Sequence, residues 1–105
     1  MDRGEVWWAD LSPPVGRRPV LLLARSRAYA VRTNITVAPV TTRIRHLDTE
    51  VSLGSNEGMP RDGVVSLEDI TTIPLSILES KITTLTNAKL EEVEIAIHVA
   101  LGLSM

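Results

Sequence analysis

The feature that most limits the fold of this chain is a succession of short strand-like segments separated by turn residues. Apolar and polar residues alternate over residues 6–11, and residues 19–24 form a short apolar run. Residues 35–41 are rich in β-branched side chains, and residues 50–53 and 63–67 are two further short candidates. Short strands joined by segments rich in glycine and proline predict a small barrel or a closely packed sheet.

The C-terminal segment has a different period, which predicts one helix. Thr86 or Asn87 is expected to cap its N-terminus, and Gly102 to end it in a left-handed conformation, with Leu103 packing back on the last turn. Ile95 and Val99 lie off the apolar stripe and leave surface that a partner subunit would cover. The stripe itself consists of Leu90, Val93, Ile97, Ala100 and Leu101.

Size and composition place the chain among globular proteins. Its 105 residues are expected to form a single domain, residues 1–105, and 44% of them are apolar. It contains no cysteine, which excludes disulfides and thiolate metal sites. The sequence has no signal-peptide pattern and no apolar run near the roughly 20 residues that span a bilayer. We therefore expect a cytoplasmic protein that does not enter a membrane.

Charge is distributed unevenly, although the net charge is only −2. Residues 12–47 contain seven arginines and no Asp or Glu, whereas from residue 51 onward three basic residues stand against eight carboxylates. This division predicts a cationic face, and the planar fork of arginine suits phosphate. A solvated, arginine-rich surface without a ligand is the alternative reading of the same pattern.

Residues typical of catalysis are few. The only histidines are His46, in a basic loop, and His98, on the expected helix. No zinc spacing, glycine-rich phosphate motif or serine-hydrolase motif is present, so neither a metal nor a cofactor is expected. What is left is Arg18 at a strand entrance and Thr41 at a strand exit, a pair able to grip a phosphate if the strands are neighbours. Pro39, inside the predicted strand over residues 35–41 that ends at Thr41, predicts an edge position or a bulge.

Five short blocks in the same order resemble the successive motifs of the MazF/PemK toxins. They are residues 3–11 (RGEVWWADL), 18–23 (RPVLLL), 39–42 (PVTT), 64–73 (VVSLEDITTI) and 100–103 (ALGL). Together they extend over nearly the whole chain. The resemblance implies an SH3-like, strongly curved β-barrel with a C-terminal α-helix, assembled as a homodimer.

The same resemblance implies a toxin of a type II toxin–antitoxin system that cleaves single-stranded RNA without a metal. The 2′-OH would attack the adjacent phosphorus and leave a 2′,3′-cyclic phosphate and a 5′-OH. It assigns catalysis to Arg18 and Thr41, while the group that takes the 2′-OH proton is left open. Residues expected to bind RNA are Arg17, Thr42, Arg43, Arg45, His46 and Asp69.

The resemblance also implies a MazE-like antitoxin, whose acidic disordered tail would compete with RNA for the arginine-rich window. Two departures bear on specificity. The loop before Arg17 is shorter than in many family members, and Asp69 stands where a glutamine that contacts a base is often found. Two alternatives stay open: a non-enzymatic toxin like the gyrase-binding CcdB group, and a module that binds RNA or protein without cleavage.

Overall fold

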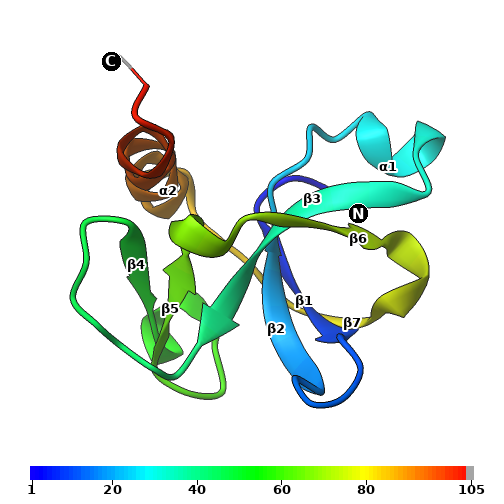
Figure 1. Cartoon of the computed structure of the whole chain (residues 1–105), viewed down its shortest axis with the longest axis horizontal. Helices are drawn as coiled ribbons and strands as arrows, with labels where there is room; N and C mark the ends of the chain where they lie inside the picture. Colours follow the sequence, from blue (N-terminus) through cyan, green and yellow to red (C-terminus); the bar gives the residue numbers. More distant parts are fainter. Residues whose placement is uncertain (104–105) are drawn as a thin grey trace.

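A computed structural model describes residues 1–103, which form a curved seven-stranded sheet with a helix at its C-terminal end (Figure 1). This arrangement confirms the mainly β fold with a C-terminal helix. In chain order the elements are β1 (Glu5–Asp10), β2 (Arg17–Leu22), α1 (Ala28–Val31), β3 (Asn34–Thr41), β4 (Glu50–Leu53), η1 (Ser55–Glu57), β5 (Gly63–Ser66), η2 (Leu67–Asp69), β6 (Thr71–Pro74), η3 (Leu75–Ile77), β7 (Leu78–Thr84) and α2 (Asn87–Leu101).

Strand β3 joins the two parts of the sheet. The strands follow the order β4-β5-β3-β2-β1-β7, and β6 also pairs with β3. The start of β3 pairs with β6, its middle with β2, and its last residues with β5. All these pairings are antiparallel, and the sheet curls into a half-barrel because β3 changes partners along its length.

Most of the predicted strands are confirmed, with shifted ends. Strand β2 begins at Arg17 rather than at Pro19, so both of its arginines lie inside the strand. Strands β6 and β7 and the short helix α1 were not predicted. Most residues of β6 and β7 are exposed or half-buried, and their sequences lack a clear alternation of apolar and polar residues.

Of the two positions expected for Pro39, an edge or a bulge, the edge position is wrong, because β3 lies between β5 and β2 in the sheet. Pro39 stands opposite Val20 of β2. On the other side of β3, the pairing with β6 ends at Val37 and the pairing with β5 begins at Val40. The Thr36 carbonyl accepts hydrogen bonds from the chain just after β2, and backbone groups alternate in direction along a strand. The missing N–H of Pro39 therefore falls in the interval between the two ladders.

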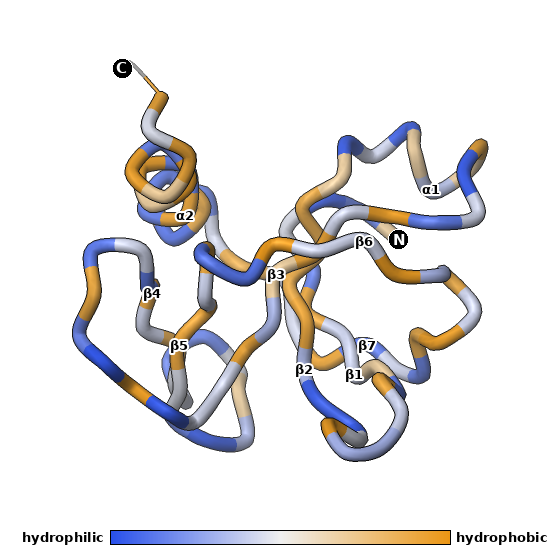
Figure 2. The backbone as a smooth tube through the Cα atoms, in the orientation of Figure 1, coloured by the Kyte–Doolittle hydropathy of each residue, from blue (hydrophilic) through white to orange (hydrophobic). Residues whose placement is uncertain are grey.

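Two apolar cores occupy the two faces of the sheet. Leu21 belongs to the core that includes Val6 and the helical residue Val93, whereas Val20 and Leu22 belong to the second core. Alternate residues of a strand point to opposite faces, so β2 contributes to both cores. Figure 2 shows how β2 changes from hydrophilic at its start to hydrophobic further along. The buried part of β2 thus supports the charged part.

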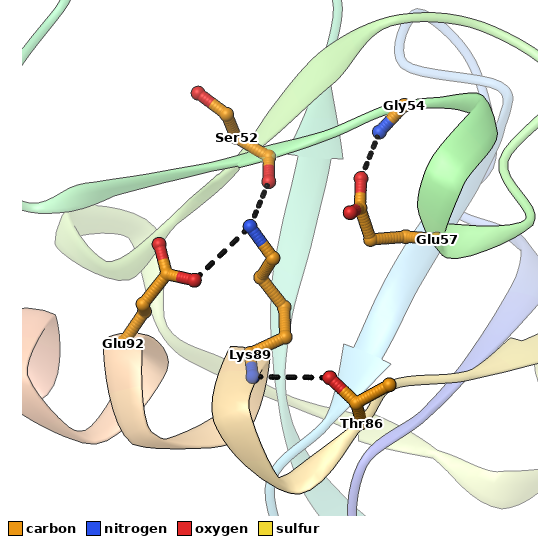
Figure 3. A network of polar contacts seen from close by, with 6 residues as sticks. All are labelled: Ser52, Gly54, Glu57, Thr86, Lys89 and Glu92. Carbon is orange, nitrogen blue, oxygen red and sulfur yellow. Dashed lines mark hydrogen bonds and ion pairs between the residues drawn. The ribbon is translucent and has the colours of Figure 1, made fainter.

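Helix α2 is fixed at its N-terminus by side chains that Figure 3 shows. The hydroxyl of Thr86 accepts a hydrogen bond from Lys89 N at 3.2 Å, which confirms Thr86 as the cap. The Lys89 ammonium donates to the carbonyl of Ser52 in β4 and pairs with Glu92. Neither helix formed by residues 1–103 has the length and apolar character needed to cross a membrane.

The outer face of α2 is partly apolar. Ile95 and Val99 are exposed, in agreement with their place off the stripe. Leu101 belongs to the apolar stripe by its spacing, but it is 58% exposed because the helix extends past the core at this point. Gly102 adopts the expected left-handed conformation with φ 66°, and the Leu103 N–H bonds back to His98 O, but its side chain is exposed.

Replacing the cap tests this account of the helix. Thr86→Ala is expected to lower the free energy of unfolding by about 1 kcal/mol, because Lys89 N loses its partner. Urea denaturation measures the change. Ser76→Ala, an exposed substitution away from α2, serves as the control, and an equal effect of the two substitutions would contradict the account.

Candidate active site

Arg18 and Thr41 occupy equivalent places on two strands that separate. The β2–β3 pairing ends at Val20 and Pro39. Continued by two residues, the same register would set Arg18 opposite Thr41. Instead, Arg18 stays paired with β1, opposite Ala9, while Thr41 pairs with Val64 of β5. Figure 1 shows β2 and β3 diverging at this point.

Two cavities open where the strands diverge, and Arg18 and Thr41 border both. The larger has a volume of about 600 Å³, and its walls come from β1 and β2 on one side and from residues 59–63 on the other. The smaller, of about 270 Å³, is bordered by the loop after β3 and by η2. Both candidate catalytic residues thus lie at the boundary between two adjoining cavities.

The guanidinium of Arg18 is held on one side and free on the other. Its Nε donates to the carbonyl of Val15 at 3.4 Å, and within residues 1–103 this is the only hydrogen bond of the side chain. Val15 belongs to the β1–β2 turn, which is closed by the bonds of Leu11 N to Gly16 O and of Gly16 N to Ser12 O. The two terminal nitrogens of Arg18 therefore keep their donors for an anion.

The hydroxyl of Thr41 is also oriented. Its oxygen accepts a hydrogen bond from Arg43 N at 3.1 Å, so the hydroxyl hydrogen stays available for donation. Gly63 packs directly on the Thr41 backbone, where a Cβ added to the glycine would lie 2.6 Å from the Thr41 carbonyl oxygen. The close approach of these two strands fixes Thr41 at the rim.

The other predicted residues are divided between the two cavities. Arg17 and Thr42 line the larger one, while Arg43, Arg45 and Asp69 line the smaller. His46 lies in the loop after β3, as Arg43 and Arg45 do, and has φ 58°, but it borders neither cavity.

Arg17 and Asp69 are already engaged within the protein. Arg17 Nε donates to Glu79 at 2.6 Å, and its guanidinium lies 4.1 Å from the centre of the Trp8 ring. Asp69 accepts a hydrogen bond from the hydroxyl of Ser66 at 2.7 Å. An incoming ligand must therefore compete with these partners or use the remaining lone pairs and donors.

Sequence reasoning missed Trp8 and Arg61 as residues of the site. Trp8 lines the larger cavity beside Arg17, and Arg61 lines it from the β4–β5 connection. Composition indicated only a loop at residues 54–62. The sequence signal that could have found it is that Arg61 is the single basic residue of this loop. However, the position of Arg61 opposite β2 depends on how the two halves of the sheet pack.

Charge differs between the cavities. The larger is lined by three arginines and one carboxylate, that of Asp62, whereas the smaller has three arginines and three carboxylates. Arg18 and Arg61 form no ion pair with any carboxylate of residues 1–103. The larger cavity can therefore hold an anion such as a phosphodiester. Within the same residues, no three His, Asp or Glu side chains come together as metal ligands.

The contact between Gly63 and Thr41 generates a test. Gly63→Ala is expected to destabilise the protein by about 1–3 kcal/mol, because the new methyl group must push against the Thr41 carbonyl. It should also move the amide resonance of Arg43, whose N–H bonds to Thr41. Urea denaturation and amide NMR measure the two effects, with Ser55→Ala as control. Unchanged stability and an unmoved Arg43 resonance would contradict the packing described.

Known proteins resemble the chain over nearly its whole length. The family described as PemK-like, MazF-like toxin of type II toxin-antitoxin system matches residues 2–101. A probable endoribonuclease, MazF5 of Mycobacterium tuberculosis, is 34% identical over 97% of this chain and 94% of its own. The solved structure of M. tuberculosis toxin MazF-mt6 has a TM-score of 0.89 and 35% identity, covering 96% and 99% of the two chains. An endoribonuclease in complex with its cognate antitoxin, from Mycobacterial species, has a TM-score of 0.89 at 25% identity, covering 100% and 98%.

Proposed function

This chain belongs to the family of PemK-like, MazF-like toxins of type II toxin–antitoxin systems. We propose that it is an endoribonuclease in which the RNA phosphate that reacts lies between Arg18 and Thr41. The observation that carries this proposal is the position of the pair. Both residues border both cavities, at the ends of two strands that diverge, and each has donors left free. A phosphate at this boundary has one neighbouring nucleotide on either side.

Arg18 stabilises the charge that develops on the phosphate. Its terminal nitrogens donate to the non-bridging oxygens, and its Nε, bonded to Val15, keeps the fork in one orientation. A donor that is already oriented needs no reorganisation as the oxygens gain charge, so it stabilises the transition state more than the bound substrate. Thr41 donates its free hydroxyl hydrogen to a phosphate oxygen while Arg43 N holds the hydroxyl oxygen.

The reaction is an internal transfer of the phosphoryl group. The ribose 2′ oxygen forms a bond with phosphorus and loses its proton to a base, while the bond from phosphorus to the 5′ oxygen breaks. The departing 5′ oxygen gains a proton, which leaves a 2′,3′-cyclic phosphate and a 5′-OH. This reaction needs no metal, because the cationic guanidinium of Arg18 serves to stabilise the pentacovalent phosphorus and its oxygens.

A single strand suits the two-cavity arrangement. The strand would pass from one cavity to the other, with Arg17 and Thr42 beside it on one side of the reacting phosphate. On the other side lie Arg43, Arg45 and Asp69, with His46 further along the same loop. Unpaired bases can turn into separate cavities, whereas a duplex keeps them stacked inside.

We also propose two protein partners. One is a second copy of the chain, for which the exposed Ile95 and Val99 on α2 supply apolar surface. The other is an antitoxin with an acidic disordered tail, supported by the related endoribonuclease that was solved with its cognate antitoxin. An acidic tail would neutralise the larger cavity and so compete with RNA for it.

Cleavage of a long mixed-sequence RNA in excess EDTA tests the proposed function. The wild-type protein should cut at selected sites and leave cyclic-phosphate ends, which mass spectrometry identifies. Arg18→Ala should lose about 10²–10³ in rate, since it removes an oriented donor to the transition state, and Thr41→Ala should also lose activity. Arg32→Ala, an exposed arginine at the end of α1 that lines neither cavity, is the control.

Two results would contradict the proposal. If the folded wild-type protein cuts no RNA, or if both site variants cut as fast as Arg32→Ala, then this pair does not carry out RNA cleavage. If the folded wild-type protein cuts no RNA at all, a toxin that acts by binding is the better account, and inhibition of DNA gyrase is the next assay.

A further inference from the structure

We infer that Arg61 binds the RNA backbone at a phosphate next to the one that is cleaved. This inference rests on the proposed function and adds a residue of the opposite wall to the site. Arg61 is exposed and lines the larger cavity from the β4–β5 connection, facing the side formed by β1 and β2. The residues next to Arg61 in the sequence do not indicate this role, because the two facing walls of the cavity come from distant parts of the chain.

The connection that carries Arg61 is held firmly at its base. The carboxylate of Glu57 accepts a hydrogen bond from Gly54 N at 2.7 Å, as Figure 3 shows, and Glu57 N bonds back to Gly54 O at 3.0 Å. Met59 N also bonds to Gly54 O, and the Met59 side chain is buried in the core beside α2. Such a connection presents its residues in a defined position.

Two glycines fix the position further. Gly58, with φ 83°, lies against Thr83 of β7, where an added Cβ would come within 2.6 Å of the Thr83 hydroxyl. Gly63 lies against the Thr41 carbonyl at the other end. Arg61 is therefore placed between a segment anchored on β7 and the residue that touches Thr41, so its distance from the reacting phosphate is constrained.

The charges of the larger cavity single out Arg61 as a free cation. Arg17 is paired with Glu79 and covers Trp8, whereas Arg18 is assigned to the reacting phosphate. Arg61 has no carboxylate partner among residues 1–103. The neighbouring Asp62 directs its carboxylate to Gly54, where an added Cβ would lie 2.7 Å from Oδ1.

An RNA strand supplies the anion that Arg61 lacks. Once one phosphate lies between Arg18 and Thr41, the strand continues through the larger cavity, and its next phosphodiester passes between the two walls. A guanidinium there forms paired hydrogen bonds with the phosphate oxygens and carries no information about the base. Arg61 should therefore contribute affinity that does not depend on sequence, and that weakens with salt.

The test measures binding apart from cleavage. The probe is a single-stranded RNA with a 2′-deoxy nucleotide at the cleavage site, which removes the attacking hydroxyl. Its dissociation constant is measured over a range of salt concentrations for wild type, Arg61→Ala, Arg61→Lys and the control Arg32→Ala. The kcat and KM of each protein are measured on the cleavable RNA.

Arg61→Ala should weaken binding about tenfold, as expected for the loss of charged hydrogen bonds, and should reduce the slope of log affinity against log salt by about 0.7. The loss of activity should appear in KM rather than in kcat, at unchanged cleavage positions. Arg61→Lys should keep the slope and recover part of the affinity, which also controls for folding. Arg32→Ala should behave as wild type.

Wild-type affinity and slope in Arg61→Ala would overturn the inference, and so would a loss confined to kcat. The proposed function fails separately. RNA binding that depends on Arg61 without any cleavage by the wild-type protein would support Arg61 and contradict the nuclease, whereas the absence of RNA binding would contradict both.

Discussion

The change of partner along β3 is the constraint on which the site depends. A strand that stayed paired with β2 to its end would bring Arg18 and Thr41 face to face across a ladder of hydrogen bonds, with no room for a ligand. Because β3 passes to β5 after Pro39, it separates from the start of β2, while the end of β2 and the middle of β3 remain paired. Proline suits this point, since it lacks the N–H that neither neighbouring ladder would satisfy.

The buried parts of the same strands give the site its rigidity. Val20, Leu21 and Leu22 pack into cores on both faces of the sheet, which leaves β2 little freedom to move. Arg18 stands two residues before this buried run, close enough to be positioned by it and still exposed to a ligand. The position of arginine beside proline and leucine is thus explained: the apolar run supplies a fixed support for a cation that needs to point in one direction.

Local patterns predicted what depends on local physics. The strands with alternating or β-branched residues, the cap at Thr86 and the left-handed Gly102 could all be inferred from neighbouring residues. The residue pattern singled out Arg18 and Thr41 as a pair able to grip a phosphate, and their catalytic role, which the resemblance to the toxin family implies, stays a prediction. Strands β6 and β7 were missed because their sequences have no apolar pattern. They form strands because β3 and β1, with which they pair, satisfy their backbone groups.

Long-range packing set the limit of prediction. Arg17 and Glu79 are 62 residues apart, so their ion pair leaves no trace in the sequence around either of them. Arg61 enters the site only because the β4–β5 connection packs on β7 and reaches across to β2. Leu101 follows the helical spacing, yet the core ends before the helix does. In each case the deciding partner lies in a different part of the chain.

The measurement that tests the central claim most directly is a crystal structure of the protein with an RNA strand that has a 2′-deoxy nucleotide at the cleavage site. The account predicts that the phosphate at that site lies at the boundary of the two cavities. Its non-bridging oxygens should be within hydrogen-bonding distance of the terminal nitrogens of Arg18 and the hydroxyl of Thr41. RNA bound on another face, or with a base rather than a phosphate at this boundary, would contradict it.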